Sequence, residues 1–119
     1  MASTEFSSLP LSAEFLANLK SLDFNTMTPI QAQCLPAVLK GQDIQAQAKT
    51  GSGKTAAFGI GLLQEINAKQ FQTQSLILCP TRELADQVSK ELRRLARPIT
   101  NLKILTLCGG KPIGPQYAS

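Results

Sequence analysis

The chain has 119 residues, 43% of them apolar, which is enough for the core of one domain and too short for two ordinary domains. Lysine and arginine together number 12 against 8 acidic residues, and the absence of histidine excludes imidazole catalysis and histidine-containing metal sites. The three cysteines are widely spaced and the N-terminus has no secretion signal, so the sequence predicts a reduced, cytoplasmic protein. No apolar run approaches the roughly 20 residues needed to span a bilayer, so no membrane contact is expected.

Two helices are predicted within the first 41 residues. Ser12 is a suitable N-cap for the first helix, which carries apolar residues at helical spacing: Phe15, Leu16, Leu19 and Leu22. The second helix opens at Thr28, where a threonine N-cap, a proline in the first turn and Gln31 three residues later form a capping box. We expect Pro36 to kink this second helix and Gly41 to end it.

Strand and helix patterns alternate through the rest of the chain. Residues 43–48 predict a short strand. A glycine-rich loop comes next, and it leads into a helix that is predicted to end at about Lys69. Residues 75–79 form a continuous apolar run that is typical of a fully buried strand. Thr81 caps another long helix, and residues 102–108 predict a third strand. Strands that alternate with helices pair in parallel, so the predicted fold class is α/β, with a parallel sheet flanked by helices.

Positive charge is concentrated in the later part of the chain. Residues 51–119 carry a net charge of +5 and residues 1–50 a net charge of −1, so we expect any anionic ligand on the later part. Part of this charge comes from Arg93, Arg94 and Arg97. We expect these arginines on the exposed side of the helix end, where cations interact favourably with the helix dipole, and assign them no nucleic-acid contact.

Residues 48–55, with the sequence A-K-T-G-S-G-K-T, lie between a predicted strand and a predicted helix and are called the phosphate loop here. Glycines at such a place let backbone N–H groups converge on an anion, and the helix N-terminus adds its positive dipole end. Lys54 is then placed to reach the β- and γ-phosphates of a nucleotide, and the Thr55 hydroxyl to bind magnesium. The general pattern has glycine where this chain has Ala48. The alternative is a glycine-rich turn that only caps an ordinary helix.

The alanine form of the loop resembles that of the DEAD-box RNA helicases, and three further stretches resemble motifs of this family in the same order. Residues 24–31, F-N-T-M-T-P-I-Q, resemble the Q motif, with Phe6 as its upstream aromatic residue. Residues 80–85, P-T-R-E-L-A, are identical to motif Ia, and the glycine doublet at 109–110 resembles the one that follows in the family. Asp23 stands where the Q motif usually has glycine. The resemblance covers nearly the whole chain and implies a RecA-like domain.

The resemblance also implies ligands, namely ATP with Mg2+ and RNA. Phe24 would pack on the adenine ring, and the carboxamide of Gln31 would hydrogen-bond its edge, for which its donor and acceptor are suited. The implied phosphate-loop contacts are Ala48, Lys49, Thr50, Gly51, Ser52, Gly53, Lys54 and Thr55, with Lys54 and Thr55 catalytic and Thr55 also holding the metal. The implied contacts to the RNA backbone are Thr81, Arg82, Gly109 and Gly110. From the residues alone, Gln31 is also a capping-box partner, and Thr81 with Arg82 is also a helix cap followed by a solvated arginine.

The implied domain organisation is a Q-motif segment at residues 1–32, followed at residues 33–119 by the N-terminal part of a RecA-like helicase ATP-binding domain. The chain ends before the family's Asp-Glu-Ala-Asp motif, so we expect an N-terminal fragment of an ATP-dependent RNA helicase that is inactive alone, because phosphoryl transfer needs the missing carboxylates. Resemblance to a bacterial member of the family implies ribosomal RNA as partner and ribosome assembly as process, and no obligate protein partner is indicated. The alternative is a non-catalytic nucleotide- or RNA-binding module, if the chain naturally ends at Ser119.

Overall fold

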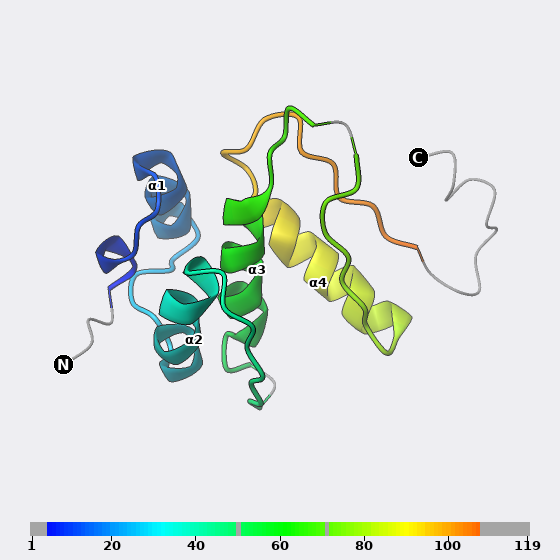
Figure 1. Cartoon of the computed structure of the whole chain (residues 1–119). Helices are drawn as coiled ribbons and strands as arrows, with labels where there is room; N and C mark the ends of the chain where they lie inside the picture. Colours follow the sequence, from blue (N-terminus) through cyan, green and yellow to red (C-terminus); the bar gives the residue numbers. More distant parts are fainter. Residues whose placement is uncertain (1–4, 50, 71, 108–119) are drawn as a thin grey trace.

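The computed structural model describes residues 5–49, 51–70 and 72–107, and its regular elements are helices (Figure 1). A short 3-10 helix, η1 (Phe6–Ser8), is followed by α1 (Ala13–Ser21), α2 (Pro29–Leu39), α3 (Lys54–Glu65) and α4 (Arg82–Leu95). Helix α3 packs against both α2 and α4, and α1 contacts α4. None of the helices described here is long and apolar enough to span a bilayer.

Local hydrogen bonds define both ends of α1. The Ser12 hydroxyl accepts the backbone N–H three residues along at 3.1 Å, which confirms the predicted N-cap. At the other end, the N–H of Phe24 donates to the Leu19 carbonyl at 2.9 Å and the N–H of Asp23 donates to the Lys20 carbonyl at 3.1 Å. This pair of bonds is a Schellman motif, which requires a left-handed residue, and Asp23 has a φ of 66°. The backbone therefore needs the conformation that glycine adopts most easily, and the motif fixes where Phe24 leaves the helix.

The capping box predicted for α2 is confirmed. The Thr28 hydroxyl accepts the N–H of Gln31 at 3.5 Å, and the Gln31 side-chain oxygen accepts the N–H of Thr28 at 2.9 Å. Pro36 lies inside α2 without ending it, and its kink stays a prediction. Gly41, with a φ of 79°, follows the helix, and its N–H donates to the Val38 carbonyl at 2.9 Å, so its predicted role in ending the helix is confirmed.

Helix α3 ends at Glu65, whereas the sequence predicted an end at about Lys69, four residues later. The reason lies in a side chain from further along the chain. The Gln74 amide oxygen accepts the backbone N–H of Asn67 at 2.8 Å, and the Gln74 amide nitrogen donates to the Asn67 carbonyl at 2.7 Å. Because these backbone groups are bound by a side chain, they are not used to extend the helix.

The segments predicted as strands are not paired into a sheet among the described residues, and here the structure differs from the sequence prediction. Residues 43–48, 75–79 and 102–107 are not paired with one another, and the β contact that the structure describes is an isolated antiparallel bridge between Glu5 and Thr26. Residues 75–79, predicted to be fully buried, expose 79% of Leu76 and 85% of Leu78. A strand forms only where its backbone groups meet a partner strand, and none of these segments supplies one for another.

The core is formed where the helices cross. Gly59 and Gly61 on α3 allow close approach: a Cβ on Gly59 would lie 2.8 Å from Leu92 Cδ2 of α4, and a Cβ on Gly61 would overlap Val38 of α2. The packing therefore excludes larger residues at both glycines. The largest apolar side chains that are completely buried come from all four α-helices: Leu19, Leu35, Ile60 and Leu95.

The cysteines partly match the expectation of core thiols. Cys34 is a free thiol buried within α2, which confirms that expectation at one position. Cys79 is also a free thiol but is only half-buried. Cys108 lies outside the described residues.

Candidate nucleotide-binding site

The phosphate loop enters α3 through two residues in the left-handed conformation. Gly51 has a φ of 84° and Gly53 a φ of 86°, and Gly53 is the N-cap of α3. A side chain at such a φ is strained, so the path of the backbone requires both glycines. The first turn of α3 then presents N–H groups without intrahelical partners and the positive end of the helix dipole. Thr50 lies outside the described residues.

Polar groups within the loop are only partly satisfied. The Lys54 ammonium folds back and donates to the Ala48 carbonyl at 3.1 Å, and the Ser52 N–H donates to the Lys49 carbonyl at 3.2 Å. The Ser52 hydroxyl is buried and has no hydrogen-bond partner among the described residues. A buried hydroxyl without a partner is unfavourable. The loop therefore has unused hydrogen-bonding capacity beside the exposed side chain of Lys54, which fits an anion such as a phosphate group.

Gln31 joins the Q motif to the phosphate loop. Its side chain is only 1% exposed, and its amide nitrogen donates to the Gly53 carbonyl at 3.1 Å while its amide oxygen accepts from Thr28. The contact is close: a Cβ on Gly53 would lie 2.5 Å from Gln31 Nε2 and 2.9 Å from Thr28 Oγ1. The capping-box role of Gln31 is therefore confirmed and extended to the loop. Its contact with adenine stays a prediction.

Phe24 packs against another aromatic residue, and Thr55 lies in the first turn of α3. The Phe24 ring packs edge-on against the ring of Phe6, with centroids 6.1 Å apart and an interplanar angle of 80°. Phe6 is buried and Phe24 half-buried, so the upstream aromatic residue lies against the aromatic residue of the Q motif. Thr55 is half-buried in the first turn of α3, directly after Lys54.

The residues that resemble RNA contacts lie at a second helix N-terminus. The Thr81 hydroxyl accepts the N–H of Leu84 at 3.1 Å, which confirms Thr81 as the N-cap of α4. Thr81 and Arg82 are both exposed. Figure 1 shows the N-terminal ends of α3 and α4 on the same lower side of the molecule, but no hydrogen bond among the described residues joins Thr81 or Arg82 to the phosphate loop. Gly109 and Gly110 lie outside the described residues.

Two long-range polar contacts were missed by the sequence interpretation. The Asn18 side-chain nitrogen in α1 donates to the carbonyl oxygens of Arg94 and Leu95 at 2.9 and 3.2 Å, and so caps the C-terminal end of α4. Arg93, expected only as an exposed cation, donates to the Ile104 carbonyl at 3.0 Å. No local pattern signals either contact, because the partners lie 11 to 77 residues apart in sequence.

Comparison with known proteins decides the family. Residues 28–119 match the family described as DEAD/DEAH box helicase. The chain belongs to this family. It is 68% identical over 104 residues to the ATP-dependent RNA helicase DbpA of Escherichia coli K12, over 87% of this chain and 23% of that protein. It is 42% identical over 113 residues to the DEAD-box ATP-dependent RNA helicase CshA of Geobacillus kaustophilus, over 95% of this chain and 24% of that protein. The chain thus spans about a quarter of the length of these relatives.

Solved structures of similar proteins confirm the fold class. A crystal structure of a DEAD box protein from the hyperthermophile Methanococcus jannaschii matches with a TM-score of 0.90 and 41% identity, over 97% of this chain and 31% of that chain. The RNA helicase Prp28 from Chaetomium thermophilum, bound to ADP, matches with a TM-score of 0.79 and 34% identity, over the same shares. The predicted RecA-like α/β class is therefore confirmed for this DEAD-box helicase chain, although its described residues pair no strands among themselves.

Proposed function

We propose that this chain is the N-terminal part of an ATP-dependent RNA helicase and that its phosphate loop binds ATP with Mg2+. The observation that carries the proposal is the loop itself: two left-handed glycines lead into the N-terminus of α3, beside Lys54 and the unsatisfied hydroxyl of Ser52. The family supports ATP as the nucleotide, since the matched relatives are named ATP-dependent RNA helicases. Residues 1–32 are proposed as the Q-motif segment and residues 33–119 as the first part of the ATP-binding domain.

Each loop residue has a different proposed role in binding the phosphates. The Lys54 ammonium, now bound to the neutral Ala48 carbonyl, would exchange that partner for a phosphate oxygen, because a hydrogen bond between two charged groups is stronger. Ser52, Gly51 and the first-turn N–H groups of α3 would supply further donors. The Thr55 hydroxyl would bind Mg2+, which neutralises charge on the phosphates. The carboxylate that holds the metal and the group that orients water are expected from the remainder of the helicase.

Adenine recognition is proposed for Phe24 and Gln31. The Gln31 amide oxygen has two lone pairs and its nitrogen two hydrogens, and the contacts to Thr28 and Gly53 use one of each. One acceptor and one donor therefore remain, which is the pair that an adenine edge requires. Because only 1% of Gln31 is exposed, binding the base also requires that the atoms covering this amide shift.

RNA binding is proposed at the N-terminus of α4. Thr81 and Arg82 are exposed there, the helix dipole favours an anion, and the arginine fork suits a phosphate group. By sequence resemblance, Gly109 and Gly110 would add backbone contacts to the same strand of RNA. We further propose ribosomal RNA as the substrate, ribosome assembly as the process and the cytoplasm as the location.

The test uses the complete helicase of which this chain is proposed to be the N-terminal part. Lys54→Ala should lower RNA-stimulated ATP hydrolysis by about 10²–10³-fold, because a preorganised cation on the transferring phosphate is lost. Lys40→Ala, which removes an exposed lysine at the end of α2, should leave the rate unchanged. Normal turnover by Lys54→Ala at saturating RNA would remove Lys54 from the mechanism.

The finer assignments are tested with the same preparation. Binding of ATP and GTP is compared in the wild-type helicase and in Gln31→Ala, and equal binding of both nucleotides by the wild type would refute base recognition by Gln31. Purified ribosomal RNA is compared with transfer RNA at equal nucleotide concentration as activator of hydrolysis. Equal activation by the two would refute the preference for ribosomal RNA while leaving the helicase assignment intact.

A further inference from the structure

A surface pocket of about 490 Å3 lies between the segment that follows α3 and the segment that follows α4. Residues 66–69 line it from the first segment and residues 98–101 from the second. Figure 1 shows both segments at the upper side of the molecule, whereas α3 and α4 begin at the lower side. Helix α4 has 14 residues, so at a rise of 1.5 Å per residue it places the pocket about 20 Å from Thr81 and Arg82. The pocket is therefore distinct from the RNA contact proposed above.

Side chains that can donate hydrogen bonds to an anion line this pocket from both segments. The Lys69 ammonium, the Thr100 hydroxyl and the Asn101 amide are exposed, and within the described part of the chain none of them forms a hydrogen bond. The loop that carries Lys69 is held in place, because its N–H donates to Asn67 Oδ1 at 3.0 Å and Gln74 binds both backbone groups of Asn67. A loop that is already ordered loses less conformational entropy when it binds a ligand.

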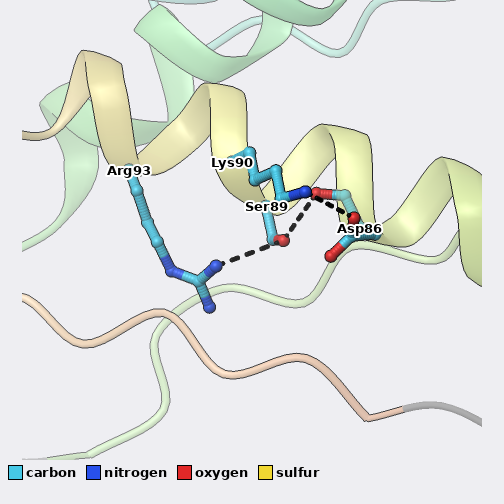
Figure 2. Close-up of polar contacts among 4 residues, drawn as sticks. All are labelled: Asp86, Ser89, Lys90 and Arg93. Carbon is cyan, nitrogen blue, oxygen red and sulfur yellow. Dashed lines mark hydrogen bonds and ion pairs between the residues drawn. The ribbon is translucent and has the colours of Figure 1, made fainter.

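The cations within α4 already have partners in their own helix. Figure 2 shows the Lys90 ammonium paired with Asp86, at 2.9 Å, and the Arg93 guanidinium donating to the Ser89 hydroxyl. Arg94 likewise forms an ion pair within the helix, at 2.9 Å. These three cations are therefore less available to an external anion.

The cations around the pocket have no such partners. Lys69, Arg97 and Lys103 are exposed, and among the residues that the structure describes their side chains form no ion pair or hydrogen bond. Arg97 directly precedes the lining residues 98–101, and Lys103 follows them by two positions. Glu65 ends α3 nearby, and each of the two helix C-termini adds about half a negative charge, so positive charge stays in excess. The pocket with these three cations is called the basic pocket here.

We propose that the basic pocket is a second RNA contact and binds phosphates of the RNA backbone. The inference rests on the proposed function and deepens it, because it adds a contact at the C-terminal ends of α3 and α4 to the one at the N-terminus of α4. Lys69 and Arg97 would bind phosphate oxygens, and Thr100 with Asn101 would donate hydrogen bonds to phosphate or to the ribose hydroxyl. Contacts of this kind strengthen binding without selecting a base sequence.

The experiment measures binding of a fluorescein-labelled single-stranded oligouridylate to the complete helicase without nucleotide, by fluorescence anisotropy over a series of KCl concentrations. Lys69→Gln/Arg97→Gln should weaken binding by about 2- to 30-fold, the range expected for the loss of two exposed ion pairs. The slope of log K against log salt should become shallower by about 1.4, because each phosphate contact to a single strand contributes about 0.7. The matched control, Lys20→Gln/Lys40→Gln, removes two exposed lysines of α1 and the end of α2 and should leave the slope unchanged.

A shallower slope in Lys69→Gln/Arg97→Gln, but not in the control or in the charge-conserving Lys69→Arg/Arg97→Lys, supports the proposal. Equal effects of the two glutamine double variants would reflect net charge alone and overturn it, as would a wild-type slope in Lys69→Gln/Arg97→Gln. If that variant loses binding of poly-L-glutamate while its RNA binding stays normal, the basic pocket serves acidic polypeptides and the proposal is wrong. If the double variant does not fold, Lys69→Gln decides, with an expected slope change of about 0.7. A wild-type helicase without RNA-stimulated hydrolysis would instead refute the proposed function, on which this inference depends.

Discussion

Replacing Gly53 by alanine is expected to separate the phosphate loop from the Q motif, and Gly51→Ala provides a matched control. Both glycines have nearly the same φ, 86° and 84°, so an alanine at either costs about 1–2 kcal/mol of backbone strain. Around Gly51, nothing lies within 4 Å of an added Cβ, and this strain is the whole expected effect. At Gly53, the added Cβ would lie 2.5 Å from Gln31 Nε2 and 2.9 Å from Thr28 Oγ1, so the amide must move.

The additional cost at Gly53 follows from the hydrogen bonds that the displaced amide loses. Gln31 makes a 3.1 Å bond to the Gly53 carbonyl and a 2.9 Å bond from the Thr28 N–H. At about 0.5–1.5 kcal/mol for each bond, their loss adds about 1–3 kcal/mol. We therefore expect Gly53→Ala to reduce the free energy of unfolding by about 2–5 kcal/mol, against about 1–2 kcal/mol for Gly51→Ala.

The measurement is urea unfolding of the chain without nucleotide, followed by circular dichroism, for both alanine variants in the wild-type and Gln31→Ala backgrounds. If the Gln31 amide is the main source of the difference, the excess cost of Gly53→Ala over Gly51→Ala should shrink once Gln31 has been removed, leaving only the 2.9 Å approach to Thr28 Oγ1. A double-mutant cycle of this kind isolates the coupling between the two residues. Equal destabilisation by the two alanines in the wild-type background, or an unchanged difference in the Gln31→Ala background, would refute the reasoning.

Two further predictions concern α1. Asn18→Ala should lower the free energy of unfolding by about 1–3 kcal/mol, because it removes the donor for two carbonyls at the end of α4. The control, Gln33→Ala, changes an exposed amide of α2 and should alter the free energy of unfolding by less than about 0.5 kcal/mol. Equal effects of the two variants in urea unfolding would contradict the capping role of Asn18. Asp23→Gly should raise the free energy of unfolding by up to about 1 kcal/mol, since glycine relieves the left-handed strain at a φ of 66° but gains unfolded-state freedom. A lower midpoint for Asp23→Gly, measured in the same way, would show that the aspartate stabilises this turn.

Sequence patterns predict correctly those features that depend on residues a few positions apart. The N-caps Ser12, Thr28 and Thr81 are all confirmed, because a capping side chain bonds a backbone N–H two or three residues away. The glycine-rich form of the phosphate loop likewise reflects local backbone geometry, with Gly51 and Gly53 in the left-handed region. The family followed from contiguous motifs of the same kind, and the match over residues 28–119 confirms it.

Which of these local elements contact one another depends instead on how the chain folds. Gln31 reads in sequence as a cap of its own helix, and its bond to Gly53, 22 residues away, depends on how α2 packs against α3. The contacts of Asn18 with α4 and of Arg93 with Ile104 likewise join partners brought together by folding. The apolar run at residues 75–79 was predicted to be a buried strand, but Leu76 and Leu78 are exposed and the run is not paired with another strand among the described residues. An apolar pattern specifies neither the strand that pairs with it nor the residues that bury it. Propensity and capping act through neighbouring residues, whereas strand pairing and inter-helix hydrogen bonds depend on segments that are distant in sequence.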